Sequence, residues 1–355
     1  MTNALAKKLL KNTKYCSTIL EESTLFTDGF VSPTKIPMLN VALSGKIDGG
    51  LTAGVTVIAG ESKSFKTMFG LLIASAYMKN NPDSIMLFYD SEFGSPPDYF
   101  ETFGIDTSRV VHTPIMNVEQ LKFDLVSQLE NIERKDNVFV FVDSIGNLAS
   151  KKEVEDAKDS KSALDMSRAK QIKSFFRIVT PYFQLNDIPG LFINHTYQTQ
   201  EMFSKTIVSG GTGVTLSSNT VWVVNKSQEK DSKKNLEGWN FNVNINKSRY
   251  VQEKKKIPIQ VFYKTGINTF SGLLQIGEEL GYIEKVGKGR YSRNMVDKET
   301  GEVIPDEKSF TKKQTDNAEF WSKLFANSDF KKAIEAHYSI GKLSEDEMVK
   351  NESVE

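Results

Sequence analysis

The chain has 355 residues, of which 39% are hydrophobic and 25% are charged. This composition supports a sizeable core and argues against wholesale disorder, so one large domain with smaller attachments is expected. The 45 basic and 45 acidic residues cancel, so any anion-binding surface must be local. The apolar runs are too short to span a membrane, no secretory signal is visible, and a single cysteine, Cys16, excludes an internal disulfide. We therefore expect a cytoplasmic protein with no membrane partner.

Residues 1–32 form a leader segment that is too short to bury a core of its own. We expect it to pack on its own domain or on a neighbouring subunit. The region 33–272 then alternates apolar strands with amphipathic helices. Near-continuous apolar runs predict buried parallel strands at 55–60, 84–90, 138–144 and 190–195. A further strand is expected at 219–226, and alternating patterns predict antiparallel strands at 239–248 and 257–263.

Two polar or glycine-rich segments, 147–163 and 196–215, break this rhythm directly after strand ends. Loops at the carboxyl ends of parallel strands are where ligands bind. From about residue 273 the pattern changes to short helices with turns, which indicates a small α+β domain over 273–355 with an acidic tail. The predicted fold class is therefore α/β, with a mostly parallel central sheet and an antiparallel extension.

The most informative motif is GESKSFKT, which lies between an apolar strand and an apolar helix. It nearly matches the phosphate-binding loop G-x-x-x-x-G-K-[ST], although a chance match in an α/β protein is the alternative. Free N–H groups at the helix N-terminus would bind a triphosphate, with Lys66 on the outer phosphates and Thr67 on Mg²⁺. Phe65 replaces the second glycine, and we expect it to keep an ordinary backbone conformation with its ring turned away from the nucleotide. The predicted binding residues are Gly60, Glu61, Ser62, Lys63, Ser64, Phe65, Lys66 and Thr67.

Polar side chains stand at the ends of three later strands. Asp143, after VFVFV, either holds the water shell of Mg²⁺ or caps a turn. Glu92, after LFYDS, either orients and deprotonates the attacking water or caps the following loop or pairs with a lysine. His195, at the end of FINH, either contacts the γ-phosphate or is a structural group. In the basic stretch NKSRYVQEKKK, Lys247 and Arg249 share one strand face, either in a solvated hairpin or as donors of positive charge to a phosphate in trans.

These motifs occur together in an order that resembles the RecA-type strand-exchange recombinases, most closely the UvsX branch of large tailed phages. The resemblance covers almost the whole chain. Its anchors are KIPMLNVALSGKIDGGLTAGVTVIAGESKSFKT, LFYDSEFG, FVDSIGNLASKKE, RIVTPYF, INHTYQTQEMFSKTIVSGGTG and SGLLQIGEELGYIEK. The phage branch also carries phenylalanine in the phosphate loop, so the resemblance places Phe65 within that branch. It implies a RecA-like ATPase core with ATP and Mg²⁺ as cofactors.

The resemblance also implies a role for each matching residue. Thr67 and Asp143 would hold Mg²⁺, and Glu92 would activate water. Tyr99 would stack on adenine, unless it is an ordinary buried aromatic residue. His195 stands where the family has a glutamine that senses the γ-phosphate. The basic pair would reach ATP on the adjacent subunit, although the family often has two lysines where this chain has Lys247 and Arg249.

By the same resemblance, the two irregular segments would be DNA-contacting loops. Phosphates would be neutralised by Lys151, Lys152 and Arg168. Met202 and Phe203 would wedge between bases, unless they pack back onto the core. Gly210 and Gly211 would offer backbone N–H groups to phosphates. The predicted DNA-binding residues are Lys151, Lys152, Arg168, Met202, Phe203, Lys205, Gly210 and Gly211.

The sequence is thus interpreted as an ATP-dependent recombinase that polymerises into helical filaments on single-stranded DNA and pairs it with homologous duplex DNA. A single-strand-binding protein and a loading mediator are the expected partners, in a bacterial or phage-infected cell. Residues 1–32 would dock on the neighbouring subunit. The alternatives are a ring-forming helicase or motor with the same core, and a non-hydrolysing accessory paralogue. A late basic group would touch duplex DNA or form a solvated face; its members are Lys285, Lys288, Arg290 and Arg293.

Overall fold

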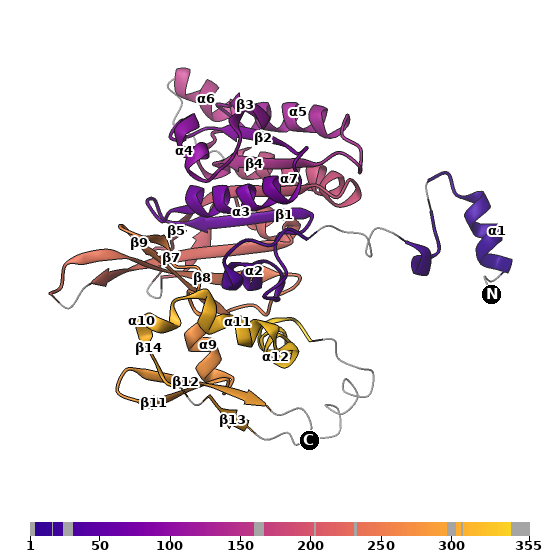
Figure 1. Ribbon diagram of the computed structural model, residues 1–355. Coiled ribbons are helices and arrows are strands. Elements are labelled where there is room, and N and C mark those ends of the chain that lie inside the picture. The colour runs from indigo at the N-terminus through magenta and orange to yellow at the C-terminus, as the bar shows by residue number, and fades with distance from the viewer. Residues whose placement is uncertain are drawn as a thin grey trace.

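The central feature of the protein is a ten-stranded sheet (Figure 1). It is seen in a computed structural model that describes residues 4–15, 17–23, 31–159, 167–201, 204–230, 233–296, 303–306 and 308–341. The strands are β1 (Gly54–Gly60), β2 (Ile85–Asp90), β3 (Val110–Pro114), β4 (Val138–Asp143), β5 (Pro189–Gln198), β6 (Thr206–Val208), β7 (Thr220–Lys230), β8 (Leu236–Ser248), β9 (Lys256–Phe262) and β10 (Gly266–Ile267). Their order is β10-β9-β8-β7-β1-β5-β4-β2-β3, and β6 pairs with β5.

The sheet has a parallel part and an antiparallel extension. Strands β7, β1, β5, β4, β2 and β3 run parallel, whereas β8, β9 and β10 follow β7 in antiparallel pairs. The predicted parallel and antiparallel strands are therefore confirmed. Strand β3 was not predicted, because its half-exposed VVHTP sequence lacks the apolar run of a buried strand.

Helices cover both faces of this sheet, as Figure 1 shows. The side chains of β4 alternate, so that Phe139 and Phe141 join one core cluster while Val138, Val140 and Val142 join the other. The first cluster packs against α2 (Pro37–Ser44) and α3 (Lys66–Asn80), and the second against α5 (Val118–Leu129) and α7 (Ser167–Leu185). The short helices α4 (Pro97–Thr102), α6 (Lys151–Lys158) and α8 (Thr212–Ser217) follow strand ends.

The C-terminal part forms a small domain below the main sheet in Figure 1. Its sheet has the order β11-β12-β13, and β14 pairs with β12. It therefore contains more strand than the predicted short helices with turns. Its elements are α9 (Leu273–Glu279), β11 (Ile283–Gly287), β12 (Arg290–Val296), β13 (Val303–Pro305), β14 (Phe310–Thr311), α10 (Lys312–Thr315), α11 (Ala318–Ala326) and α12 (Ser328–Tyr338).

One of the predicted DNA contacts in this domain is wrong. Arg293 is 5% exposed, and its guanidinium forms an ion pair with Asp306. It also donates to the carbonyl oxygen of Phe320 and lies over the ring of Phe310. A cation that is held in this way stabilises the domain and has no surface to offer to a phosphate.

The described N-terminal helix lies apart from the main body (Figure 1). Helix α1 (Ala4–Asn12) contributes no buried residue to the described part of the chain, and Figure 1 shows it projecting away from the sheet. This agrees with the expectation that the segment cannot form its own core. None of the helices in the described ranges has the length and apolar character needed to cross a membrane.

Candidate functional site

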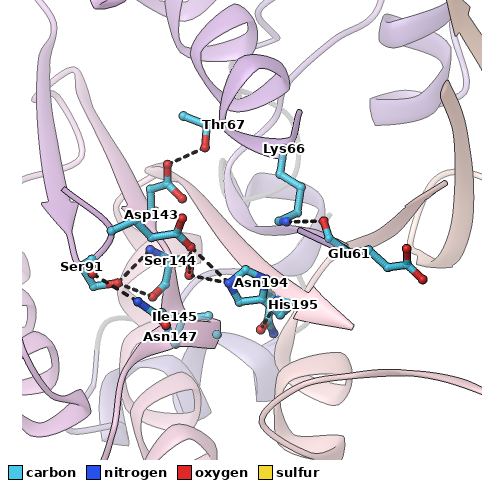
Figure 2. A network of polar contacts seen from close by, with 12 residues as sticks. Glu61, Lys66, Thr67, Ser91, Asp143, Ser144, Ile145, Asn147, Asn194 and His195 are labelled. Carbon is cyan, nitrogen blue, oxygen red and sulfur yellow. Dashed lines mark hydrogen bonds and ion pairs between the residues drawn. The ribbon is translucent and has the colours of Figure 1, made fainter. Parts of the chain in front are cut away.

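The predicted phosphate loop connects the end of β1 to the start of α3. A side chain at Gly60 would lie 2.7 Å from Ser64 Oγ and 2.8 Å from the Val224 carbonyl oxygen, so only glycine fits there. Ser64 Oγ donates to the carbonyl oxygen of Glu61 at 2.7 Å. Lys66 Nζ donates to the same oxygen at 2.9 Å (Figure 2). The ammonium of Lys66 is thus held over the loop, and burial lowers its pKa.

Phe65 differs from the sequence prediction. Its φ is +59° and its ψ is 28°, which is the left-handed conformation and not an ordinary one. The tight turn demands this conformation from whichever residue stands there, and glycine would adopt it at no steric cost. The ring lies 5.3 Å from the ring of Phe241 in β8, centroid to centroid.

Thr67 and Asp143 meet at the start of α3. Thr67 Oγ1 donates to Asp143 Oδ2 at 2.7 Å (Figure 2). The other oxygen, Oδ1, is one of three buried side-chain atoms in the described residues that lack a hydrogen-bond partner. The pKa of Asp143 is raised to about 6, mainly by burial and in part by the nearby charge of Glu92. A cation would relieve this arrangement, so the pair fits Mg²⁺.

The protein supplies only part of a metal shell at this position. Within the described ranges, no group of three or more His, Cys, Asp or Glu side chains is placed to hold a metal ion. Mg²⁺ typically keeps several waters and is shared between one or two protein oxygens and substrate phosphates. The hydroxyl of Thr67 and the carboxylate of Asp143 match that pattern.

Glu92 lies at the centre of a second polar cluster. Its Oε1 is 3.1 Å from His195 Nε2 and accepts a hydrogen bond of 2.8 Å from Ser144 Oγ. The hydrogen bond with His195 is the main reason why the pKa of Glu92 is lowered, so the carboxylate is held in its ionised form. The sequence patterns predict separate roles for Glu92 and His195; their direct contact comes from the convergence of the β2 and β5 ends.

The end of β5 also connects the site to the glycine-rich segment. Asn194 Nδ2 donates to the carbonyl oxygen of Ser209 at 2.9 Å, and Ser209 N donates to the carbonyl oxygen of His195 at 2.9 Å. Asn194 is 1% exposed. These two hydrogen bonds join the end of β5 to the backbone that precedes Gly210 and Gly211.

One cleft brings most of the predicted nucleotide contacts together. It has a volume of about 420 Å³ and is lined by the loop from Ser62 to Met68 together with Glu92, Asp143 and His195. Tyr99 in α4 lines the same cleft and packs edge-on against Phe103, with 5.4 Å between the ring centroids. Its ring is partly buried against the core.

Lys247 lies near the end of β8 and Arg249 lies one residue beyond that strand, at the far end of the sheet, so the two do not share one strand face as predicted. The register pairs Gly60 with Val224 at the phosphate-loop end, whereas it pairs Thr220 with Ser248 at the other. Lys247 Nζ donates to the carbonyl oxygens of Thr215 and Leu216, at 2.7 and 2.9 Å. Lys247 and Arg249 are therefore remote from the phosphate loop of their own chain.

The predicted DNA contacts fall into several environments. Lys151 and Lys152 begin helix α6, whose capping box joins Ser150 and Glu153, so the first segment is more regular than expected. Their ammonium groups are exposed and lie near acidic residues one helical turn further along the chain.

In the second predicted segment, Lys205 is also exposed and lies 3.7 Å from Glu201. Gly210 and Gly211 have φ values of 91° and 77°. Met202 and Phe203 lie outside the described residues.

Arg168 has a different position from the predicted phosphate contact. Its guanidinium donates to the carbonyl oxygens of Ile145, Gly146 and Leu148, at 3.3, 2.7 and 2.6 Å. It also donates to Ser209 Oγ at 3.3 Å. The predicted role is corrected, because these donors are used within the protein, where they join the segment after β4 to the segment after β6.

The sheet carries a phosphate loop after β1 and acidic residues at the ends of β2 and β4, which together are typical of a phosphate-loop nucleotide-binding protein. The RecA N-terminal domain family matches residues 31–268, and the C-terminal domain family of the bacteriophage T4 recombination and repair protein matches residues 270–334. The chain belongs to the RecA family, in the branch that contains the T4 (UvsX) protein, and it is a recombinase.

Individual relatives agree with this family. The recombination and repair protein of Enterobacteria phage T4 is 49% identical over 349 residues, which are 98% of this chain and 89% of that protein. Protein RecA of Mesomycoplasma hyopneumoniae strain J is 24% identical over 242 residues, 67% of this chain and 70% of that protein. Protein RecA of Kineococcus radiotolerans is 26% identical over 261 residues, 72% of each chain.

Proposed function

We propose that this recombinase is a single-stranded-DNA-dependent ATPase that forms helical filaments and promotes homologous pairing and strand exchange. The observation that carries the proposal is the meeting of Lys66, Thr67, Glu92 and Asp143 in one cleft at the carboxyl ends of parallel strands. The proposed roles in recombination, repair and recombination-dependent replication rest on the kinship to the T4 protein, whose name states recombination and repair.

The residues in the cleft supply binding and proton transfer. Lys66 would exchange the carbonyl oxygen of Glu61 for oxygens of the outer phosphates. The negative charges of these phosphates would offset the cost of desolvating its ammonium group. Bound Mg²⁺ would neutralise phosphate charge beside Thr67 and Asp143. Glu92 would orient the attacking water and accept its proton, because its lowered pKa keeps the carboxylate ready as a base. Tyr99 would stack on the adenine.

His195 would report the state of the γ-phosphate. A phosphate within reach of the His195 ring would compete with Glu92 for the imidazole. The contact of 3.1 Å between His195 Nε2 and Glu92 Oε1 would then break, and Glu92 would be free to bind the attacking water. Asn194 and Ser209 would pass this change to the glycine-rich segment. Such an order–disorder coupling between nucleotide and loop supports DNA binding that depends on ATP.

Assembly would complete the site. Lys247 and Arg249 are too far from their own phosphate loop to act on it, so they would donate positive charge to ATP held by an adjacent subunit. This arrangement places the nucleotide between two copies of the chain. It also makes hydrolysis depend on filament formation.

A surface for this assembly is available at the edge of the sheet. Strand β3 is the last strand, and Val111, Met116 and Phe123 near it are 49%, 73% and 68% exposed. An exposed edge strand with an apolar patch readily accepts another chain. Helix α1 carries Leu5 and Leu9, which are 60% and 61% exposed. We propose that this helix of one subunit covers the β3 edge of the next.

The exposed lysines near the two loop segments support binding to single-stranded DNA through its backbone. Lys151, Lys152 and Lys205 are each exposed beside a carboxylate, and each would exchange that partner for a phosphate. Gly210 and Gly211 offer N–H groups, and such contacts give little sequence preference. A single-strand-binding protein, a loading mediator, and an intracellular location remain predictions. Glu92 and Lys66 are both present, which argues against a non-hydrolysing paralogue.

Phosphate release with and without single-stranded DNA tests the proposal. Wild-type protein should hydrolyse ATP only slowly until DNA is added, and Lys66→Ala should abolish turnover. Lys79→Ala, an exposed change on the same helix, serves as the matched control and should leave turnover intact. Electron microscopy of the DNA complex should show open helices and not closed rings. DNA-stimulated hydrolysis by the Lys66 variant would remove the central assignment.

A further inference from the structure

Two residues of the phosphate loop have left-handed backbones although neither is a glycine. Lys63 has a φ of 61° and Phe65 has a φ of 59°. A side chain disfavours this region, and such conformations persist only when the surroundings hold them. The loop therefore needs support from outside itself, and the identity of that support is not apparent from the motif.

One cross-strand residue pair of the antiparallel extension, the Lys226–Phe241 rung, contacts both strained residues. Lys226 of β7 donates from Nζ to the carbonyl oxygen of Lys63 at 2.7 Å. Phe241 of β8 places its ring 5.3 Å from the ring of Phe65. Lys226 and Phe241 are direct cross-strand partners, so their side chains leave the same face of the sheet side by side.

Each member of this rung is itself fixed. The ammonium of Lys226 lies 4.3 Å from the centroid of the Trp239 ring. Phe241 is fully buried and packs edge-on against Phe69 of α3, with 5.5 Å between centroids. Trp239 lies two residues before Phe241 on β8, and therefore on the same face of that strand. The supporting side chains are held before any ligand arrives.

We propose that the Lys226–Phe241 rung positions the phosphate loop and does the work that the second glycine does in the usual motif. Phe241 holds Phe65 left-handed through ring packing, and Lys226 holds Lys63 through its carbonyl oxygen. The N–H groups after these residues then point into the cleft without being reorganised on binding. The inference rests on the proposed nucleotide binding at this loop, and it makes both residues positioning residues and not catalytic ones.

Variants at residue 65 separate ring support from backbone strain. Phe65 is 37% exposed, so its removal leaves no closed cavity. Alanine loses the ring but keeps the strain, whereas glycine loses both. The affinity for Mg·ATPγS, measured by titration calorimetry, should fall about tenfold in Phe65→Ala and stay within about threefold of wild type in Phe65→Gly.

A second comparison tests Phe241 through its dependence on residue 65. Phe241→Leu keeps most of the core volume and should fold, which thermal melting checks. It should weaken nucleotide binding about fivefold when residue 65 is phenylalanine. It should have almost no effect when residue 65 is glycine, because nothing strained remains to be held. A purely structural role of Phe241 would give the same loss in both backgrounds and would overturn this half of the proposal.

Lys226 is tested in the same way through Lys63. Lys226→Met should weaken binding several-fold, and Lys63→Gly in the same chain should restore it. Lys230→Met, which removes an equal charge from exposed β7 residue Lys230, should have no effect. Failure of the rescue would mean that Lys226 acts through its charge on the phosphates. Equal affinities of the alanine and glycine variants at residue 65 would overturn the inference alone, whereas a wild-type chain that binds no nucleotide would overturn the proposed function as well.

Discussion

Replacing Asp143 by asparagine should stabilise the protein in the absence of Mg²⁺ while it removes Mg²⁺-dependent nucleotide binding. Asp143 is 3% exposed, and its Oδ1 has no partner among the described residues. Asparagine keeps an oxygen that can accept the hydroxyl of Thr67 but carries no charge. The substitution thus removes the burial penalty of the carboxylate and leaves the local packing in place.

The magnitude and the sign follow from the raised pKa of Asp143. The ordinary pKa is 3.8 and the folded value is about 6. Below the ordinary value both states carry the proton; as the pH rises, the unfolded chain ionises first, so the free energy of unfolding of the wild type falls. Above the pKa of the folded state this loss of unfolding free energy is complete. A pKa difference of about two units corresponds to a loss of about 3 kcal/mol. The asparagine variant should escape this loss.

Urea denaturation in EDTA at several pH values between 5 and 7.5 provides the assay. The variant should exceed the wild type by up to about 3 kcal/mol at pH 7 and by roughly half of that at pH 5. Asp83→Asn, an exposed change, is the control and should show no such trend. Added Mg·ATP should raise the stability of the wild type only. A variant that is less stable than the wild type at pH 7 without metal would refute the reasoning about the buried carboxylate.

Three further changes test other parts of the molecule. Arg249→Ala should lower the ATP turnover of filaments at least tenfold while nucleotide affinity at concentrations that prevent assembly stays unchanged; normal turnover would refute action in trans. Arg168→Lys keeps the charge but not the fork-shaped donor set, so it should weaken the nucleotide dependence of oligonucleotide binding, measured by anisotropy, as much as Arg168→Ala does. Arg293→Met should destabilise the C-terminal domain by about 3 kcal/mol in thermal melts without changing duplex-DNA affinity, with exposed Lys288→Met as its control.

The sequence allowed the buried strands and their polar ends to be predicted because both depend on local patterns. Continuous apolar runs identify strands that are covered on both faces, and parallel strands bring their carboxyl ends to one edge. Asp143 and Glu92 could therefore be assigned to one site before any coordinates. The edge strand β3 was not predicted, because its partly exposed residues do not form the continuous apolar run on which the prediction depends.

Other features depend on contacts between distant segments, which no local pattern reports. Phe65 was expected to have ordinary backbone angles, but tertiary packing on Phe241 overrides its local preference. Arg168 could not be distinguished from a DNA contact, since its partners come from two other segments. Helix α6 was also missed, although the S-x-x-E capping box that begins at Ser150 is a local pattern that could have indicated a helix start.

The distribution of the site residues over the two ends of the sheet has a physical consequence for control. The residues proposed to bind phosphate and metal and to act as the base lie at one end, whereas Lys247 and Arg249 lie at the other. Under the proposed function, a single chain would therefore hold a nucleotide without supplying the positive charge that the transition state needs. Strands β7 and β8 contact the phosphate loop at one end and lead to the two basic residues at the other, so one pair of strands would link the nucleotide of its own subunit to that of its neighbour.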